Sequence, residues 1–246
     1  MDFDGNDRTR ENNYRKKMSS ILKALRMRRR RLEVEKCSSC DIKTIGDYTL
    51  IMSNKWHGIR SNKGQTLLDP IYDYVDVMED VCMCIVKVMD TYLLYDLVDA
   101  RFVNLPELNS YKRFGYMLEV TTDDGVGLFS FRMKRLLVPT RYLETTHTDK
   151  GRYLWVKTVD GEYGFYDTLT AGIVKVPKAT SECLDGHEDY MFVVVDNRVH
   201  CINETGNYDP DRLRVCALQN KGRIRLTNSN RHISIISDVY GNILNK

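Results

Sequence analysis

The sequence lacks the features that would place the protein in a membrane or on a secretory route. No uninterrupted apolar run approaches the roughly 18 residues that cross a bilayer. The N-terminus, MDFDGNDRTRENNYRKK, has no apolar stretch of the kind that secretory signals carry. We therefore expect no membrane span, no secretory signal, and a cytoplasmic or virion location.

Paired cysteines are lacking too, which argues against a disulfide scaffold. Seven cysteines are scattered over 246 residues, whereas disulfide-rich domains are short and densely paired. Cys37 and Cys40 have the spacing of half a zinc site, but no second pair follows at the usual distance, so they are weak metal candidates. Cys82 and Cys84 alternate within an apolar run and are expected in the core. We expect reduced thiols and no cofactor.

Catalytic signatures are missing as well. No serine or cysteine lies in a nucleophile motif such as G-x-S-x-G. The glycine-bearing stretch 123–127, DDGVG, is not followed by a helical pattern that could bind phosphate, so it is read as a hairpin turn. The histidines do not cluster, since they stand at positions 57, 147, 187, 200 and 232. We therefore predict a non-enzymatic protein without catalytic residues.

Charge is distributed unevenly along the chain. Residues 1–36 hold 12 Lys and Arg against 6 Asp and Glu, a net charge of +6. The remaining 210 residues hold 25 against 28, a net charge of −3. This asymmetry predicts two regions with different tasks, a basic N-terminal arm and junction at 1–41 and a body at 42–246.

The arm has the pattern of a basic helix over residues 10–36. Its apolar residues recur at helical spacing, at Tyr14, Met18, Ile21, Leu22, Leu25 and Leu32. Four interpretations stay open: a solvated helix, docking on an acidic protein surface, binding of nucleic acid or phosphate, and contact with an anionic membrane surface. The candidate residues for binding a partner or polyanion are Lys16, Lys17, Lys23, Arg26, Arg28, Arg29, Arg30 and Arg31.

The body repeats one pattern of strand, turn and strand. Aligning the copies gives anchor positions 58, 94, 127, 164, 200 and 235, with spacings of 36, 33, 37, 36 and 35. Three glycines, Gly64, Gly206 and Gly241, lie six residues beyond their anchors. A period of about 35 residues is typical of an array in which no unit buries its apolar face alone.

Within each unit the residues favour strands. MFVVVD, VCMCIVKV and YLWVKT are rich in β-branched and aromatic residues. Outside the arm no helical period extends beyond about two turns. We predict an all-β body of six units with an N-terminal basic α-helix. The units form either a small β-propeller-like ring, in which the strand before Gly58 completes the last sheet, or an open β-solenoid.

Residues 161–167, GEYGFYD, resemble the core of the WG β-repeat family, and Gly64 to Pro70 followed by Tyr72-Asp73 resembles the later half of that repeat. The resemblance covers residues 46–246. Only the fourth copy has the aromatic–glycine pair, Tyr163-Gly164; the others are degenerate. The resemblance implies a β-repeat architecture with a partner-binding surface, and it brings no catalytic residues.

These patterns together predict a structural or adaptor subunit of a larger assembly, such as a bacteriophage particle. Protein partners would bind the β-repeat surface, and the basic arm would anchor the subunit. The alternative is a nucleic-acid-binding module that uses the Arg-rich helix.

Overall fold

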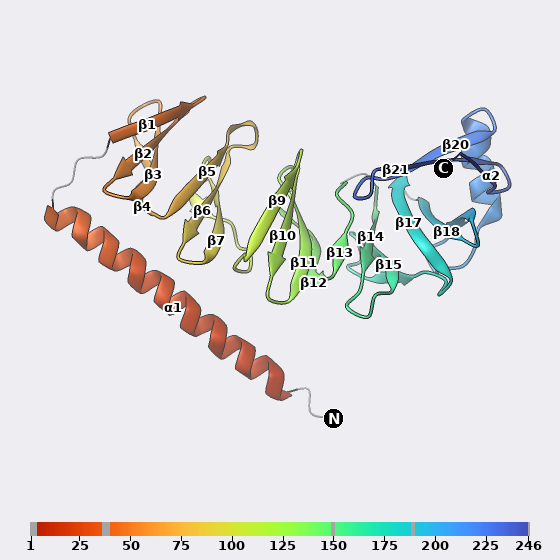
Figure 1. Cartoon of the computed structure of the whole chain (residues 1–246), viewed down its shortest axis with the longest axis horizontal. Coiled ribbons are helices and arrows are strands. Elements are labelled where there is room, and N and C mark those ends of the chain that lie inside the picture. The colour runs from red at the N-terminus through yellow and green to blue at the C-terminus, as the bar shows by residue number, and fades with distance from the viewer. Residues whose placement is uncertain (1–3, 36–39, 149–150, 188–189, 246) are drawn as a thin grey trace. The chain divides into compact units, whose positions relative to one another are not determined.

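The structure, a computed structural model, describes residues 4–35, 40–148, 151–187 and 190–245. The chain divides into two compact units, Met1–Asn109 and Ser110–Lys246. Both are built mainly from small antiparallel sheets in which each strand pairs with the next one along the chain (Figure 1). Hairpin connections allow this order, because antiparallel neighbours need only a short turn between them.

The first unit holds one long helix and two four-stranded sheets. Helix α1 spans Asp4–Glu35, and a short 3-10 turn spans Glu79–Val81. The first sheet consists of β1 (Cys40–Ile45), β2 (Tyr48–Ser53), β3 (Trp56–Ser61) and β4 (Thr66–Tyr72). The second consists of β5 (Tyr74–Met78), β6 (Met83–Val88), β7 (Thr91–Asp96) and β8 (Arg101–Phe102).

The second unit holds four sheets and a shorter helix, α2 (Pro210–Gln219). Its first two sheets are β9 (Ser110–Phe114), β10 (Met117–Thr122), β11 (Gly125–Ser130) and β12 (Arg135–Tyr142), then β13 (Glu144–Thr145), β14 (Tyr153–Lys157), β15 (Tyr163–Asp167) and β16 (Ile173–Lys175). The last two are β17 (Thr180–His187), β18 (Tyr190–Val195) and β19 (Arg198–Ile202), then β20 (Arg223–Asn228), β21 (Ile233–Asp238) and β22 (Ile243–Asn245).

Each predicted unit corresponds to one sheet in the described part of the chain. The six anchors fall in β3, β7, β11, β15, β19 and β21, one in each sheet. The predicted N-terminal helix is also present, and it begins earlier than position 10. The predicted closing strand is wrong, because β2 pairs with β1 and β3 in a sheet of its own.

Helix α2 corrects the prediction of a body made only of strands. It follows β19, in the place where the fifth sheet would have its fourth strand. Asp209 caps it by accepting a hydrogen bond from the backbone N–H of Arg212 at 3.1 Å, and Pro210 occupies its first turn. Its buried residues, Leu213, Cys216 and Ala217, have helical spacing. Ten residues are too short a stretch for that period to stand out.

The anchor-bearing strand of every sheet ends in a turn held by a side-chain oxygen. Asp96 accepts hydrogen bonds from the backbone N–H groups of Val98 (2.9 Å) and Asp99 (3.0 Å). Asp238 does the same for Tyr240 (2.8 Å). Such turns need short polar side chains. The equivalent residues, two or three positions after the anchors, are Ser61, Asp96, Ser130, Asp167, Asn203 and Asp238.

The anchor glycines themselves lie inside strands, where a neighbouring backbone passes close to them. A Cβ on Gly58 would lie 2.4 Å from the carbonyl oxygen of Leu68, and one on Gly127 would lie 2.7 Å from that of Val138. In both places the last strand bulges away from the regular register. His200 needs no glycine, since β19 is the last strand of its sheet among the described residues.

Candidate functional site

One side of α1 packs on the sheets of the first unit. Ile21 is only 2% exposed and lies in a core cluster with Ile71, Tyr72 and Val75. Three other predicted apolar residues, Met18, Leu25 and Leu32, are partly buried against the same cluster. Leu22 instead points outward and is 46% exposed; the side chain of Tyr14 lies outside what the structure describes. We call this packed side the inner face of α1.

Arg28 is the main polar contact of the inner face. Its guanidinium donates to the carbonyl oxygen of Ile71 at 2.8 Å and to both carboxylate oxygens of Asp73 at 2.9 and 3.1 Å. It also lies 5.4 Å from the ring centre of Trp56. Asp73 accepts a further bond from the backbone N–H of Met89 at 2.7 Å. Arg28 therefore connects α1 to the first sheet directly and to the turn after β6 through Asp73.

Three more candidate residues also contact the first unit. Lys17 forms an ion pair with the buried carboxylate of Glu107, with 3.0 Å between Nζ and Oε2. Arg29 pairs with Asp69. The guanidinium of Arg31 lies 6.0 Å from the Trp56 ring centre. Lys17, Arg28 and Arg29 therefore bind acidic residues of the same chain. The docking of the arm on a partner protein stays a prediction.

The charge balance of the first unit suits this docking. Residues 4–35 hold 11 Lys and Arg against 5 Asp and Glu, which gives +6. Residues 40–109 hold 6 against 11, which gives −5. A signal for the inner face was present in the sequence: Lys17, Ile21, Leu25, Arg28 and Leu32 follow one another at intervals of three or four residues. Such residues share one side of a helix, whatever their polarity.

The other four candidate residues lie on the opposite side of α1, which we call the outer face. Lys16, Lys23, Arg26 and Arg30 are exposed. None of their side chains is paired with a described residue. A groove of about 660 Å³ follows this face, and its lining includes Ser19, Leu22, Lys23, Arg26, Met27 and Arg30.

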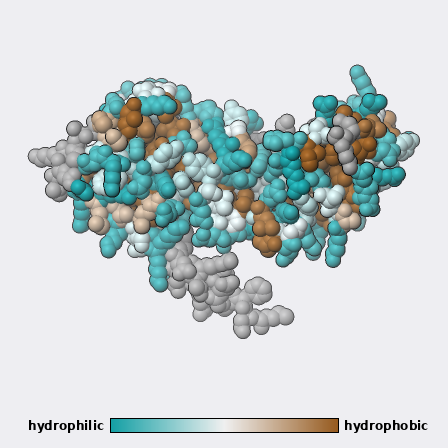
Figure 2. Space-filling view, in the orientation of Figure 1, coloured by the Kyte–Doolittle hydropathy of each residue, from teal (hydrophilic) through white to brown (hydrophobic). Residues whose placement is uncertain are grey.

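The composition of the outer face is unusually one-sided. Positions 12–32 contain no Asp or Glu. Leu22 and Met27, which is 62% exposed, lie on the two margins of the basic row. Figure 2 shows hydrophilic residues over much of the visible surface of the described chain. The outer face can therefore attract anions, and its margins can contact apolar groups.

The weak metal candidates receive no support. Cys37 lies outside the described residues. Cys40 is exposed and its thiol contacts the carbonyl oxygen of Met52 at 3.5 Å. No group of three or more metal-ligating side chains occurs among the described residues. Cys84 is buried in β6 as predicted, and burial raises the pKa of its thiol. Cys82 differs from the prediction, because it lies in the left-handed turn before β6.

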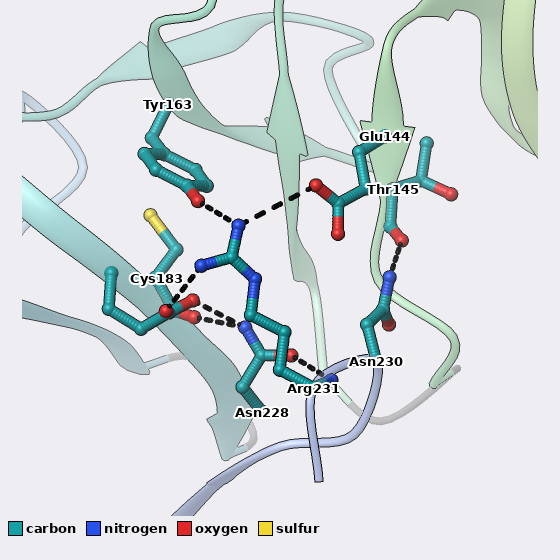
Figure 3. A network of polar contacts seen from close by, with 8 residues as sticks. Glu144, Thr145, Tyr163, Cys183, Asn228, Asn230 and Arg231 are labelled. Atoms are coloured by element: carbon teal, nitrogen blue, oxygen red, sulfur yellow. Dashed lines mark hydrogen bonds and ion pairs between the residues drawn. The ribbon is translucent and has the colours of Figure 1, made fainter. Parts of the chain in front are cut away.

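A network of polar side chains in the second unit connects three sheets (Figure 3). Arg231 donates to Glu182 Oε2 at 2.8 Å and to the Tyr163 hydroxyl at 2.7 Å, and it lies 3.8 Å from Glu144 Oε2. Asn228 donates to Glu182 Oε1 at 2.6 Å and to the carbonyl oxygen of Cys183 at 3.0 Å. These residues come from β13, β15, β17, β20 and the turn after β20.

The network holds the sheets of the second unit together. Burial raises the pKa of the Glu182 carboxyl, against the lowering effects of Arg231 and Asn228. Nearby, Asn230 joins the loop to β13 by donating to the carbonyl oxygen of Thr145 at 2.6 Å. Sequence reasoning missed these residues because they are far apart along the chain and share no motif.

Neither described helix combines the length and the apolar composition that crossing a lipid bilayer requires.

No protein-family model matches the sequence, and no curated protein matches it. Several solved structures are distantly similar. The computationally designed protein Ika8 is 10% identical, and the match covers 82% of this chain and 72% of that chain with a TM-score of 0.35. Hsv2 of Kluyveromyces lactis is 8% identical, with coverages of 79% and 71% and a TM-score of 0.35. The N-terminal domain of Nup159 is 9% identical, with coverages of 55% and 42% and a TM-score of 0.30. These likenesses are too distant to bear on function.

Proposed function

We propose that the protein is a non-enzymatic adaptor or structural subunit of a larger assembly, and that the outer face of α1 binds a protein partner. One observation carries the proposal: the basic residues of α1 divide into two sets. Lys17, Arg28 and Arg29 form ion pairs with the first unit. Lys16, Lys23, Arg26 and Arg30 lie exposed on the other side. A helix fixed along one side presents its remaining charges in a defined row, which favours specific recognition.

The small sheets supply the platform in this proposal. Antiparallel sheets joined by short turns leave loops and sheet edges for further partners. Whether the six units form a propeller-like ring without the predicted closing strand, or an open solenoid, stays a prediction, as does their membership of the WG β-repeat family. A bacteriophage particle and a cytoplasmic or virion location are the settings that we propose for the assembly.

The second candidate function is nucleic-acid binding, and the same exposed row of cations favours it. Lys and Arg side chains three or four residues apart on a helix can contact successive phosphates. Residues 15–33, the part of α1 whose side chains are described, include no aromatic residue for base stacking. Residues 40–109, which include the sheets that support the helix, hold five more acidic than basic residues, 11 against 6. These features make a protein partner the better match.

Charge reversal on the outer face tests the proposal. Affinity-tagged full-length protein and its Arg26→Glu/Arg30→Glu variant would be expressed in the native host, purified, and compared by native mass measurement. We expect the wild type to retain a protein partner and the variant to lose it, with an unchanged circular dichroism spectrum. Retention of a nucleic acid by the wild type, with a steep salt dependence, would support the second candidate instead.

A matched control distinguishes an effect of the outer face from an effect of the overall charge. Arg223→Glu/Arg225→Glu makes the same charge change at exposed positions of β20 in the second unit. It should leave the partner bound. Equal loss from both variants would contradict a role for the outer face, because it would show that only overall charge matters.

A further inference from the structure

We infer that the outer face of α1 binds an acidic amphipathic helix of a partner protein, whose carboxylates face the basic row and whose apolar side chains cover Leu22 and Met27. This inference rests on the proposed function and specifies the chemistry of the partner. From Lys16 to Arg30 the row is about 21 Å long, at the 1.5 Å rise per residue of an α-helix. A helical segment of about 16 residues matches that length.

Charge is the first reason for an acidic partner. Four cations, Lys16, Lys23, Arg26 and Arg30, lie exposed on one side of α1, and positions 12–32 supply no acid to neutralise them. A partner helix with Asp or Glu at intervals of three or four residues presents its carboxylates in a similar row. Arg side chains can also bind carboxylates through two parallel hydrogen bonds.

The exposed apolar residues are the reason for a protein partner. Leu22 is 46% and Met27 62% exposed, one on each margin of the basic row. A phosphate backbone would gain nothing from covering them, whereas leucine or methionine side chains of a protein would. Met27 adds an adaptable contact, because methionine has an unbranched and flexible side chain.

A lipid surface suits the outer face less well. A helix that binds a membrane inserts a continuous apolar face among the lipids. The apolar face of α1 is already occupied, because Ile21, Leu25 and Leu32 pack on the sheets of the first unit. Two apolar residues on separate margins are too few to replace that face.

The extent of the basic surface also favours a short partner segment over a long polyanion. Nucleic acid extends well beyond 21 Å, and residues 40–109 of the same unit hold 11 acids against 6 bases. Like charges repel noticeably within a screening length of about 10 Å at ordinary salt. A short acidic helix can remain on the row and avoid this repulsion.

Two synthetic peptides of 18 residues test the inference with the full-length protein. Both carry four Glu on one side; the first has two Leu flanking them, and the second has Ser in their place. We expect the Leu peptide to bind about tenfold more tightly than the Ser peptide, measured by fluorescence anisotropy. Arg26→Glu/Arg30→Glu should weaken both peptides about tenfold or more.

The double variant Leu22→Ser/Met27→Ser gives the decisive comparison. Both residues are exposed, so the fold should persist, as circular dichroism would confirm. This variant should bind the two peptides equally, since it lacks the apolar margins. The control Arg223→Glu/Arg225→Glu should leave both affinities unchanged.

Three binding results would overturn the inference: equal binding of the two peptides by the wild type, tighter binding of a single-stranded oligonucleotide than of the Leu peptide, or tighter binding of anionic-lipid vesicles than of that peptide. Its failure can be distinguished from failure of the proposed function. If the Leu22→Ser/Met27→Ser variant retains the partner that co-purifies with the wild type, the inference is wrong and the proposed function stands. If the wild type retains no protein at all, the proposed function fails.

Discussion

The two units hold distant segments together in different ways. In the first unit, α1 is attached from outside: Ile21 is its one buried core residue among those described, and the ion pair between Arg28 and Asp73 leaves the side chains 15% and 34% exposed. In the second unit, Asn228 is fully buried at the centre of a network between sheets. A buried polar group must keep its partners, whereas a partly exposed pair can exchange them for water. The ion pair of Arg28 is therefore adjustable, whereas the contacts of Asn228 are obligatory.

Removal of Asn228 should have the largest effect. Asn228→Ala leaves Glu182 Oε1 and the Cys183 carbonyl oxygen buried without their donor, so the second unit should lose about 3 kcal/mol of stability. The two tryptophans report the units separately, since Trp56 lies in the first and Trp155 in the second. In a Trp56→Phe background, the urea transition seen by Trp155 should move to lower urea.

The control uses the opposite background. With Trp155→Phe, the transition reported by Trp56 should be unchanged by Asn228→Ala. An equal shift of both transitions would contradict independent attachment, because it would show that the two units unfold as one.

Substitution of the anchor glycines should destabilise the sheets of both units to a similar extent. Gly58→Ala and Gly127→Ala each place a Cβ within 2.7 Å of a backbone carbonyl oxygen. Each substitution should therefore lower the free energy of unfolding by about 2 kcal/mol. Gly164→Ala is the matched control. Its Cβ would lie 3.2 Å from Cγ2 of Ile173, an exposed side chain that can shift, and 3.4 Å from the carbonyl oxygen of Val174. This variant should lose less than about 1 kcal/mol of stability. Equal losses at all three positions, in urea unfolding, would be inconsistent with the bulged register.

Loss of Arg28 should have the smallest effect on stability. Arg28→Ala removes the contacts with Ile71 and Asp73, but water can reach the Asp73 carboxylate. We expect the first unit to lose about 1 kcal/mol, measured by Trp56 fluorescence in the Trp155→Phe background. A loss of stability as large as that of Asn228→Ala would contradict the comparison, because the contacts of Arg28 would then stabilise the first unit as much as the contacts of Asn228 stabilise the second.

The sequence was sufficient for features that depend on local pattern. The N-terminal helix and the six units could be predicted, because helical spacing and a period of about 35 residues are visible in single stretches of chain. Helix α2 was missed because its period covers only Pro210–Gln219. The turn side chains, such as Asp96 and Asp238, recur at the same period as the anchors and could have been found by extending the alignment.

The candidate site was predicted only in part. All eight basic residues lie on α1, but their division into two faces depends on which acids the sheets bring near. Asp69, Asp73 and Glu107 come from β4 and two loops, and no single-sequence pattern pairs them with Arg29, Arg28 and Lys17. The network of Arg231 could not be predicted for the same reason. Its partners Glu182 and Glu144 are 49 and 87 residues away along the chain.

Hydrogen exchange of the α1 backbone shows whether the first unit fixes the helix by its inner face and leaves the outer face free. In the full-length wild type, amides around Ile21 and Arg28 should be protected for as long as those of β4, and Arg28→Ala should shorten that protection while leaving β6 unchanged. If the α1 amides exchange as fast as those of an isolated helical peptide while the sheets remain protected, α1 is not fixed on the first unit, and the account of its two faces is wrong.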